Sequence, residues 1–434
     1  MPSESFDSYF RGMLQRKHPR AVHPGYVNEA LNVAFIGGTP VSRPGIRPFT
    51  GVKFSGNVRG MGWHVDDTGF RELLVAAGAA FQRAVEGGDP VNLPLTNLPA
   101  VDQTRTEPER VNFLSLSGGA ATTIIYDGVN QNLKWTGTAL TKLGFVRGTT
   151  PPAPTIAGGG NIDAGTRDYV ITFFSTLHEG DPSATPTSVT NAAGQQNTFA
   201  SPVQGVDFDD PQISEWRLYR TRKGAKDFFF VGSADIGLPI TDNVADDDLD
   251  AGTPLEELRN TAPPAPFVAM CEHRGQVVGV TNDDLNIIRF SNFDEQYMVP
   301  EGWPADWVWP VAHGDGDEIR ALVSFHEYIV VFKTNGAWAL SGTWPDFQIV
   351  PVLAAGGGKR IGIGVNAPGS ILQIENQVIF ASRDGIYALE RGNGVEATRL
   401  SGPIDDLYAA ARFSLGAATS FDRKRRLFVM WGHG

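Results

Sequence analysis

Short apolar runs separated by turn residues dominate the second half of the chain. Residues 328–340 and 377–389 align without gaps. Each segment holds an apolar strand, an Asn-Gly or Asp-Gly pair and a second apolar strand, which is the pattern of a β-hairpin. Residues 277–290 are a looser copy, and residues 412–431 begin another. Repeats of about 40–50 residues with four strands each are typical of β-propeller blades.

A four-stranded blade cannot cover its own two apolar faces, so blades are stable only when they stack around an axis. We therefore predict an all-β chain whose residues 61–150 and 265–434 are two arcs of one interrupted propeller. Residues 1–60 are punctuated by proline and glycine and are predicted to form an extended N-terminal arm.

The first arc leaves one choice of secondary structure open. Apolar residues recur every four positions from Leu73 to Val85, which suits a helix. Strands at residues 73–76 and 79–82 are favoured instead, because Gly78 between them weakens a helix. Residues 122–126 followed by Asp127-Gly128 predict a clearer strand and turn.

Two near-identical proline runs, at residues 149–154 and 261–266, bracket the middle of the chain. Proline fixes φ and removes a backbone donor, so each run should be a stiff connector. Between them, residues 167–175, 214–221 and 227–231 are rich in aromatic and β-branched residues. Residues 151–264 are therefore predicted to fold as an inserted fibronectin- or immunoglobulin-like β-sandwich whose two ends lie close together.

Composition limits the function classes. The net charge of −12 argues against a general nucleic-acid binder, which needs clustered Lys and Arg. The single cysteine, Cys271, leaves no disulfide framework within the chain and suits a reducing compartment. The sequence shows no apolar run long enough for a transmembrane helix, and no signal peptide is expected.

Two loops offer weak candidates for ion or phosphate binding. Asp246, Asp248 and Asp250 have the spacing of a calcium loop, but Ala251 stands where the sharp turn needs glycine. A solvated turn is the favoured interpretation. Residues 356–360, Gly-Gly-Gly-Lys-Arg, depart from the P-loop pattern and are interpreted as a loop between blades. No metal site and no cofactor is therefore predicted.

Two further segments are candidate interaction sites. Arg423, Lys424, Arg425 and Arg426 form the densest basic run, which could contact DNA or an acidic neighbour or could be an exposed hairpin turn. Trp303, Trp307 and Trp309 lie close together in sequence. Exposed, they would form a patch for a partner or a glycan; a buried loop cluster is the favoured alternative.

With these modules in place, the chain resembles the tail-nozzle and tail-tubular structural proteins of short-tailed bacteriophages. The resemblance rests on an arm with residues 26–33 followed by Gly37-Gly38-Thr39-Pro40 and Ser42-Arg43-Pro44-Gly45. It rests also on the fibronectin-like segment with residues 216–221 and Thr241-Asp242, and on the degenerate propeller. It covers nearly the whole chain as module order, although the chain is shorter than the larger nozzle proteins.

The resemblance implies a non-enzymatic virion protein, assembled in the host cytoplasm and located in the tail or neck. It implies a homo-oligomeric ring, commonly a hexamer, that forms or supports the channel through which genomic DNA leaves. Other tail or head-to-tail adaptor proteins would be its partners, without stable membrane association. The alternative is a propeller that binds or cleaves glycans, as a host-adhesion or sialidase-like protein, which would need carboxylates and arginines gathered at the central mouth.

Overall fold

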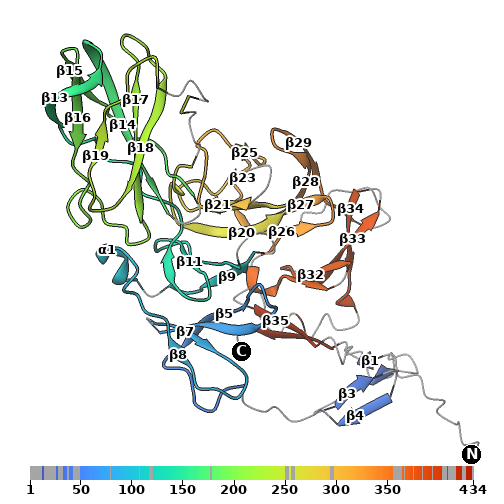
Figure 1. The fold of residues 1–434 in the computed structure, drawn as a ribbon. Coiled ribbons are helices and arrows are strands. Elements are labelled where there is room, and N and C mark those ends of the chain that lie inside the picture. The colour runs from blue at the N-terminus through green and yellow to red at the C-terminus, as the bar shows by residue number, and fades with distance from the viewer. Residues whose placement is uncertain are drawn as a thin grey trace, which may run out of the picture. The chain divides into compact units, whose positions relative to one another are not determined.

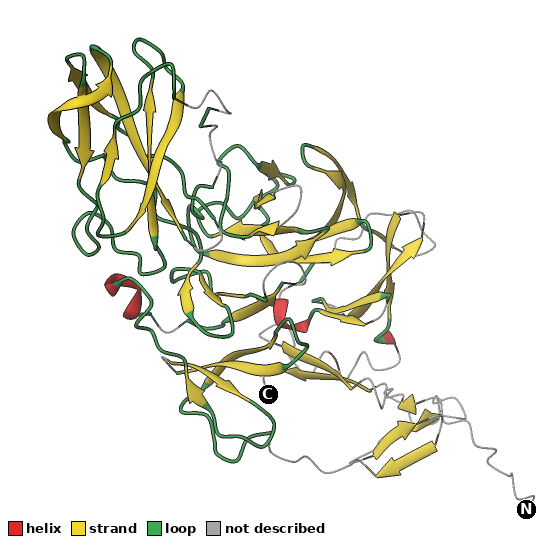
Figure 2. Cartoon of the chain, in the orientation of Figure 1, coloured by secondary structure: helices red, strands yellow, loops and turns green. Residues whose placement is uncertain are grey.

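The computed structural model of the chain is all-β in the residues that it describes (Figures 1 and 2). These are residues 12–13, 26–27, 33–36, 39–42, 49–78, 80–106, 108–116, 121–175, 178–249, 254–255, 260–293, 298–354, 364–365, 367–374, 376–383, 385–392, 394–402, 408, 417–422 and 427–432. The chain divides into two compact units. Unit 1 comprises Met1–Pro48 and Val311–Gly434, and unit 2 comprises Phe49–Pro310.

Unit 2 begins with a four-stranded antiparallel sheet in the order β5-β6-β7-β8. Its strands are β5 (Val58–Val65), β6 (Arg71–Ala77), β7 (Ala80–Ala84) and β8 (Val91–Asn92). The strand interpretation around Gly78 is therefore confirmed: Gly78 has a φ of 59° in the β6–β7 hairpin, which glycine adopts without penalty. The short helix α1 (Ala100–Gln103) follows this sheet.

Two more antiparallel sheets belong to unit 2. The second sheet contains β9 (Asn112–Ser115), β10 (Thr123–Tyr126), β11 (Leu133–Trp135) and β12 (Leu140–Lys142). The third contains β20 (Phe267–His273), β21 (Gln276–Thr281), β22 (Ile287–Phe290) and β25 (Val308–Pro310), with β23 (Asn292–Phe293) paired to β24 (Met298–Val299) beside it. The strands predicted near residues 122–126 and 277–290 are confirmed.

The three sheets pack face to face through two apolar cores. Leu74 and Ala76 of the first sheet share a core with Trp135 of the second. The opposite face of the second sheet, through Ile124, packs with Phe267 of the third. The middle sheet is thus covered on both sides, which is why every residue of β10 is buried.

Residues 155–242 of unit 2 form two further sheets that face each other (Figure 1). One has the order β13-β16-β19, and the other β15-β14-β17-β18. A core containing Phe199 of one sheet and Trp216 of the other joins them, as in a β-sandwich. The strands are β13 (Thr155–Ile162), β14 (Gly165–Phe174), β15 (Thr187–Asn191), β16 (Gln195–Phe199), β17 (Glu215–Thr221), β18 (Phe228–Asp235) and β19 (Ile240–Asp242).

Unit 1 contains both predicted repeat hairpins. Residues 328–340 fold into β27 paired with β28, and residues 377–389 into β32 paired with β33. Phe332 of the first hairpin and Phe380 of the second belong to one core, with ring centroids 4.9 Å apart. The first sheet contains β26 (Ile319–Phe325), β27 (Tyr328–Lys333), β28 (Ala337–Thr343) and β29 (Asp346–Pro351). The second sheet contains β30 (Leu353–Ala354), β31 (Leu372–Ile374), β32 (Gln377–Ala381), β33 (Ile386–Gly392) and β34 (Gly394–Arg399). The short 3₁₀ helix η2 (Pro368–Ser370) precedes β31.

The remaining elements of unit 1 are strand pairs. The described parts of the predicted arm within unit 1 form β1 (Gly12–Met13) with β2 (Tyr26–Val27), and β3 (Val33–Ile36) with β4 (Thr39–Ser42). Near the C-terminus, β35 (Ala417–Asp422) pairs with β36 (Leu427–Gly432), as the apolar pattern of that segment indicated.

Candidate functional site

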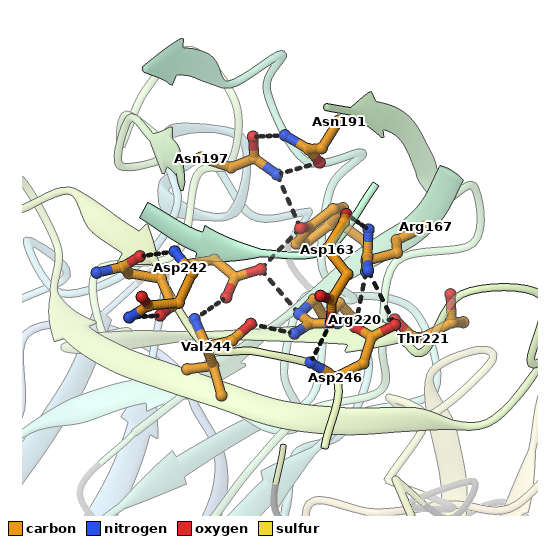
Figure 3. A network of polar contacts seen from close by, with 12 residues as sticks. Asp163, Arg167, Asn191, Asn197, Arg220, Thr221, Asp242, Val244 and Asp246 are labelled. Carbon is orange, nitrogen blue, oxygen red and sulfur yellow. Dashed lines mark hydrogen bonds and ion pairs between the residues drawn. The ribbon is translucent and has the colours of Figure 1, made fainter. Parts of the chain in front are cut away.

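Two buried arginines form the centre of the densest polar network in the described sandwich (Figure 3). Arg167 of β14 and Arg220 of β17 have fully buried side chains. Both lie on the inward face of their strands, the same face as the apolar residues two positions away, Tyr169 and Leu218. A guanidinium cannot lose its proton, so each buried arginine requires anionic partners.

Asp246 satisfies both arginines. Its carboxylate accepts hydrogen bonds from Arg167 Nε at 2.8 Å and Arg167 Nη2 at 2.9 Å, and from Arg220 Nη1 at 2.6 Å. The backbone N–H of Lys223 adds a fourth at 3.0 Å. Burial alone would raise the pKa of Asp246, but the hydrogen bonds from Arg167, Lys223 and Arg220 outweigh it and hold the pKa far below its usual range.

Asp242 lies on the other side of Arg220. The fully buried pair is joined at 2.8 Å between Arg220 Nε and Asp242 Oδ2, and the Tyr169 hydroxyl donates to the same oxygen at 2.7 Å. Asn197 Nδ2 donates to the Tyr169 hydroxyl at 2.9 Å and continues the chain toward Asn191. Burial and the Asp242 charge raise the pKa of Tyr169. We call Arg167, Tyr169, Arg220, Asp242 and Asp246 the tip network.

The contacts of the tip network bear on the calcium-loop candidate formed by Asp246, Asp248 and Asp250. The carboxylate of Asp246 is held by two guanidinium groups, which occupy the positions that a cation would need. Asp248 is exposed, and Asp250 lies outside the described residues. Within the described part of the chain, no group of three or more His, Cys, Asp or Glu residues is arranged to hold a metal ion. Asp246 therefore neutralises buried arginines and is not a solvated turn residue, whereas Asp248 lies exposed in the turn, as the favoured interpretation of this segment expected.

At its opposite end a loop of the sandwich is bonded to both connectors. Asp181 accepts from the Asn260 backbone N–H at 3.0 Å and from the Thr261 hydroxyl, while its own carbonyl accepts from Gly148 N–H at 3.1 Å. Asn260 Nδ2 also donates to the Glu179 carbonyl at 2.7 Å. Both connectors are therefore tied to the same loop of the sandwich.

A buried charge cluster reinforces this end. Lys134 of the second sheet pairs with Glu301 at 2.6 Å, and His178 of the sandwich lies 3.6 Å from the second Glu301 oxygen. Burial would raise the pKa of Glu301, but Lys134 and His178 lower it. We call Lys134, His178, Asp181, Asn260 and Glu301 the base clamp.

The segment that precedes the first connector touches the second connector. A side chain at Gly144, whose φ is 89°, would lie 2.6 Å from Pro263 Cδ. Only glycine fits at this position. Because glycine has no side chain, the segment before the first proline run can lie directly against the segment that contains the second. The expectation that the two ends of the sandwich lie close together is confirmed.

The predicted interaction residues have different locations. Trp303 is buried, with its ring centroid 4.4 Å from that of Phe267 and its Nε1–H donating to the Pro300 carbonyl at 3.0 Å. Trp307 is also buried, and Trp309 is partly exposed. The structure thus agrees with the buried cluster, and an exposed patch of all three does not form. Arg423–Arg426 and residues 356–360 lie outside the described residues.

Sequence reasoning missed the tip arginines and the base clamp. Arg167 and Arg220 could have been found, because strand alternation places both among inward apolar residues. Their partners lie far along the chain, as do those of Lys134 and Asp181, and no local signal marks them.

Comparisons with known proteins give no family for this chain: no family model matches it, and no curated protein matches it. Among solved structures, the extracellular domain of a putative hybrid two-component system from B. thetaiotaomicron matches 87% of this chain and 39% of that one, at 10% identity and a TM-score of 0.33. The chain therefore spans about two fifths of the length of that structure.

Two further solved structures match this chain with similarly low identity and TM-score. Apo AztD from Citrobacter koseri is matched over 77% of this chain and 84% of that one, at 10% identity and a TM-score of 0.25. Hsv2p from Kluyveromyces lactis is matched over 87% and 97%, at 9% identity and a TM-score of 0.28. Likenesses this weak carry no argument about function.

The helices of the described residues include none long and apolar enough to cross a membrane.

Proposed function

We propose that this chain is a virion structural protein, a subunit of an oligomeric ring in the tail nozzle or head-to-tail region of a short-tailed bacteriophage. Its fold would be a β-propeller interrupted by a fibronectin-like sandwich. The ring would form or support the channel through which genomic DNA leaves, and the net negative charge would limit adhesion of the passing DNA.

Stacked sheets of four or five strands support the propeller part of the proposal. In unit 2 the first and second sheets are consecutive in sequence, and the second and third share a core across the sandwich segment. In unit 1 the sheet β26–β29 shares a core with the sheet containing β31–β34. Blades of a propeller pack in this way, each covering the apolar face of the one before it. We propose that both sets belong to one ring.

The base clamp is the observation that carries the functional part. Asp181 and Glu179 bond a loop of the sandwich to Asn260 of the second connector. Glu301 in turn lies between His178 of the sandwich and Lys134 of the second sheet. Hydrogen bonds to charged groups contribute about 1.5–3 kcal/mol each, and the Lys134–Glu301 bond is the one of these that is buried. A module held this firmly suits a mechanical part that keeps its position while DNA passes, and it suits a binding domain on a flexible tether poorly.

The proposal is tested on purified particles of the phage that encodes the chain. Quantitative mass spectrometry should find several copies per particle, and cross-linking should join the chain to itself and to tail or neck proteins. A chain found only in lysates of infected cells, and absent from particles, would contradict the proposal. Cleavage of sialosides or polysaccharides by the purified protein would favour the glycan-acting alternative.

A further inference from the structure

His64 is buried between the first and second sheets of unit 2, with 2% of its surface exposed. It lies on the face of β5 that carries Gly60 and Gly62, where any side chain would collide with Val111 or Phe113. These glycines let β5 approach the second sheet closely. His64 is therefore the polar side chain of β5 that enters this tight contact.

A directed chain of hydrogen bonds assigns the proton on this imidazole. The Ser115 hydroxyl donates to the Trp63 carbonyl, which can only accept. Ser115 has one proton, so at the 3.1 Å contact between Ser115 Oγ and Thr123 Oγ1 the threonine must donate. Thr123 then has no proton left for His64, so at 3.0 Å the imidazole Nδ1–H donates to Thr123 Oγ1.

The other ring nitrogen is consequently unprotonated in the neutral imidazole. Nε2 has no hydrogen-bond partner among the residues that the structure describes. It lies under the β11–β12 turn, where a side chain at Gly137 would come within 3.2 Å of it. An acidic solution can add its proton only here, and the new N–H would be a buried donor without an acceptor.

Three carboxylates act on His64 from the elements packed around it: Glu72 of β6, and Asp66 and Asp67 of the β5–β6 turn. Arg83 of β7 is paired with Glu72. Glu72 is already engaged, because it accepts from Trp135 Nε1 at 2.6 Å and from Arg83 at 3.4 Å. On the facing side, β9 and β10 contribute hydroxyls and apolar side chains, and Lys134 of β11 is bonded to Glu301.

We infer that His64 is a proton-sensitive lock between the first and second sheets: neutral His64 holds the sheets together, and its protonation on Nε2 loosens the contact. This inference goes beyond the proposed function and does not depend on it. A virion protein, a glycan binder or an enzyme with this contact would show the same response to acid.

The direction of the effect follows from the pKa. Burial lowers the pKa of His64 below 6.5, and the nearby carboxylates of Glu72, Asp66 and Asp67 oppose it only in part. His64 therefore binds a proton at higher pH when the two sheets have separated (the open state) than when they are packed together (the closed state). The closed contact keeps its full stability above about pH 6.5 and loses it as the pH falls below that value.

The tautomer is tested on the full chain with ¹⁵N-labelled histidine. Long-range ¹H–¹⁵N spectra at pH 7.5 should show Nδ1 protonated and Nε2 unprotonated for His64, and the T123S variant should keep this pattern because it keeps the hydroxyl. His64→Gln assigns the signals. A protonated Nε2 at this pH would overturn the inference.

The lock is tested by hydrogen exchange, corrected for the intrinsic effect of pH. Peptides from β5 and β9 should exchange faster at pH 5 than at pH 7, by somewhat less than about tenfold for a pKa difference of one unit and by no more than about thirtyfold at this pH. His64→Gln should remove this acceleration, and the exposed control His313→Gln should retain it. An equal acid response in the wild type and His64→Gln would contradict the lock. Should His64→Gln fail to fold, Thr123→Val must still change the response, because it removes the acceptor of Nδ1–H.

Discussion

The two ends of the sandwich are stabilised by different kinds of polar contact. At the tip, Arg167 and Arg220 bind aspartates of the sandwich itself, so the tip network closes the module on its own. At the base, Asp181 and His178 bond to residues outside the two sheets, so the base clamp sets where the module stands. The comparison separates integrity of the sandwich, which depends on the tip, from its placement, which depends on the base.

The largest effect is expected at Arg220. Replacing it with methionine leaves the buried Asp242 without its cation, and removing one partner of a buried pair costs about 3–5 kcal/mol. Exchange protection of β14 and β17 should fall accordingly. Arg217→Met is the matched control, because Arg217 lies on the outer face of β17 and is partly exposed, so about 1 kcal/mol is expected. Equal losses in the two variants would contradict the role of the tip network.

A smaller loss is expected at the junction of the connectors. Gly144→Ala places a methyl group against Pro263 and forces alanine to a φ of 89°, which together should destabilise unit 2 by about 2–3 kcal/mol. Gly224→Ala is the control: its φ is 70° but no atom lies within 4 Å of the added carbon, so only the backbone cost of about 1 kcal/mol applies. Chemical denaturation measures both variants, and indistinguishable midpoints would show that the segment around Gly144 does not touch the second connector.

The base clamp is expected to act on placement more than on stability. Asp181→Ala removes the bonds to Asn260 and Thr261, at about 2 kcal/mol, and leaves the tip intact. Spin labels at the exposed positions Val206 and Val129 report the distance between sandwich and second sheet. The distribution should be narrow in the wild type and broader in Asp181→Ala, whereas the exposed control Asp227→Ala should leave it unchanged. A broad wild-type distribution would contradict the clamp.

Acid should weaken the tip by a smaller amount. The pKa of Asp246 is depressed in the folded chain, so its contribution is complete above about pH 4 and declines as the pH falls toward the folded value. About 1 kcal/mol should be lost by pH 3, at 1.4 kcal/mol per pH unit. Asp246→Asn should be less stable at pH 7 and should show a flatter pH profile. Parallel profiles for the two proteins would rule out this role of Asp246.

The hairpins could be predicted from sequence because their signals are local. Asn335-Gly336 joins two apolar strands, and Gly78 separates two others, so turn chemistry and alternation suffice. The tip shows the limit of such reasoning. Strand alternation indicates that Arg220 points inward. Its partners Asp242 and Asp246 lie at and after the end of β19, two strands further along the chain, and no residue near Arg220 in sequence indicates them.

The tryptophans show a second limit. Three indoles within a short proline-bounded loop suit either an exposed patch or a packed cluster, and composition does not separate the two. The choice depends on Phe267, which lies in β20, far from this loop in sequence, and packs against Trp303. Long-range packing of this kind, like the Lys134–Glu301 pair, is absent from any local pattern.

The decisive experiment is electron cryomicroscopy of the tail and neck of purified particles. Several copies of the chain should surround the DNA channel, each with its sandwich in one fixed orientation on the stacked sheets of four or five strands. Particles without the chain, or copies whose sandwich density is smeared over many orientations, would contradict it.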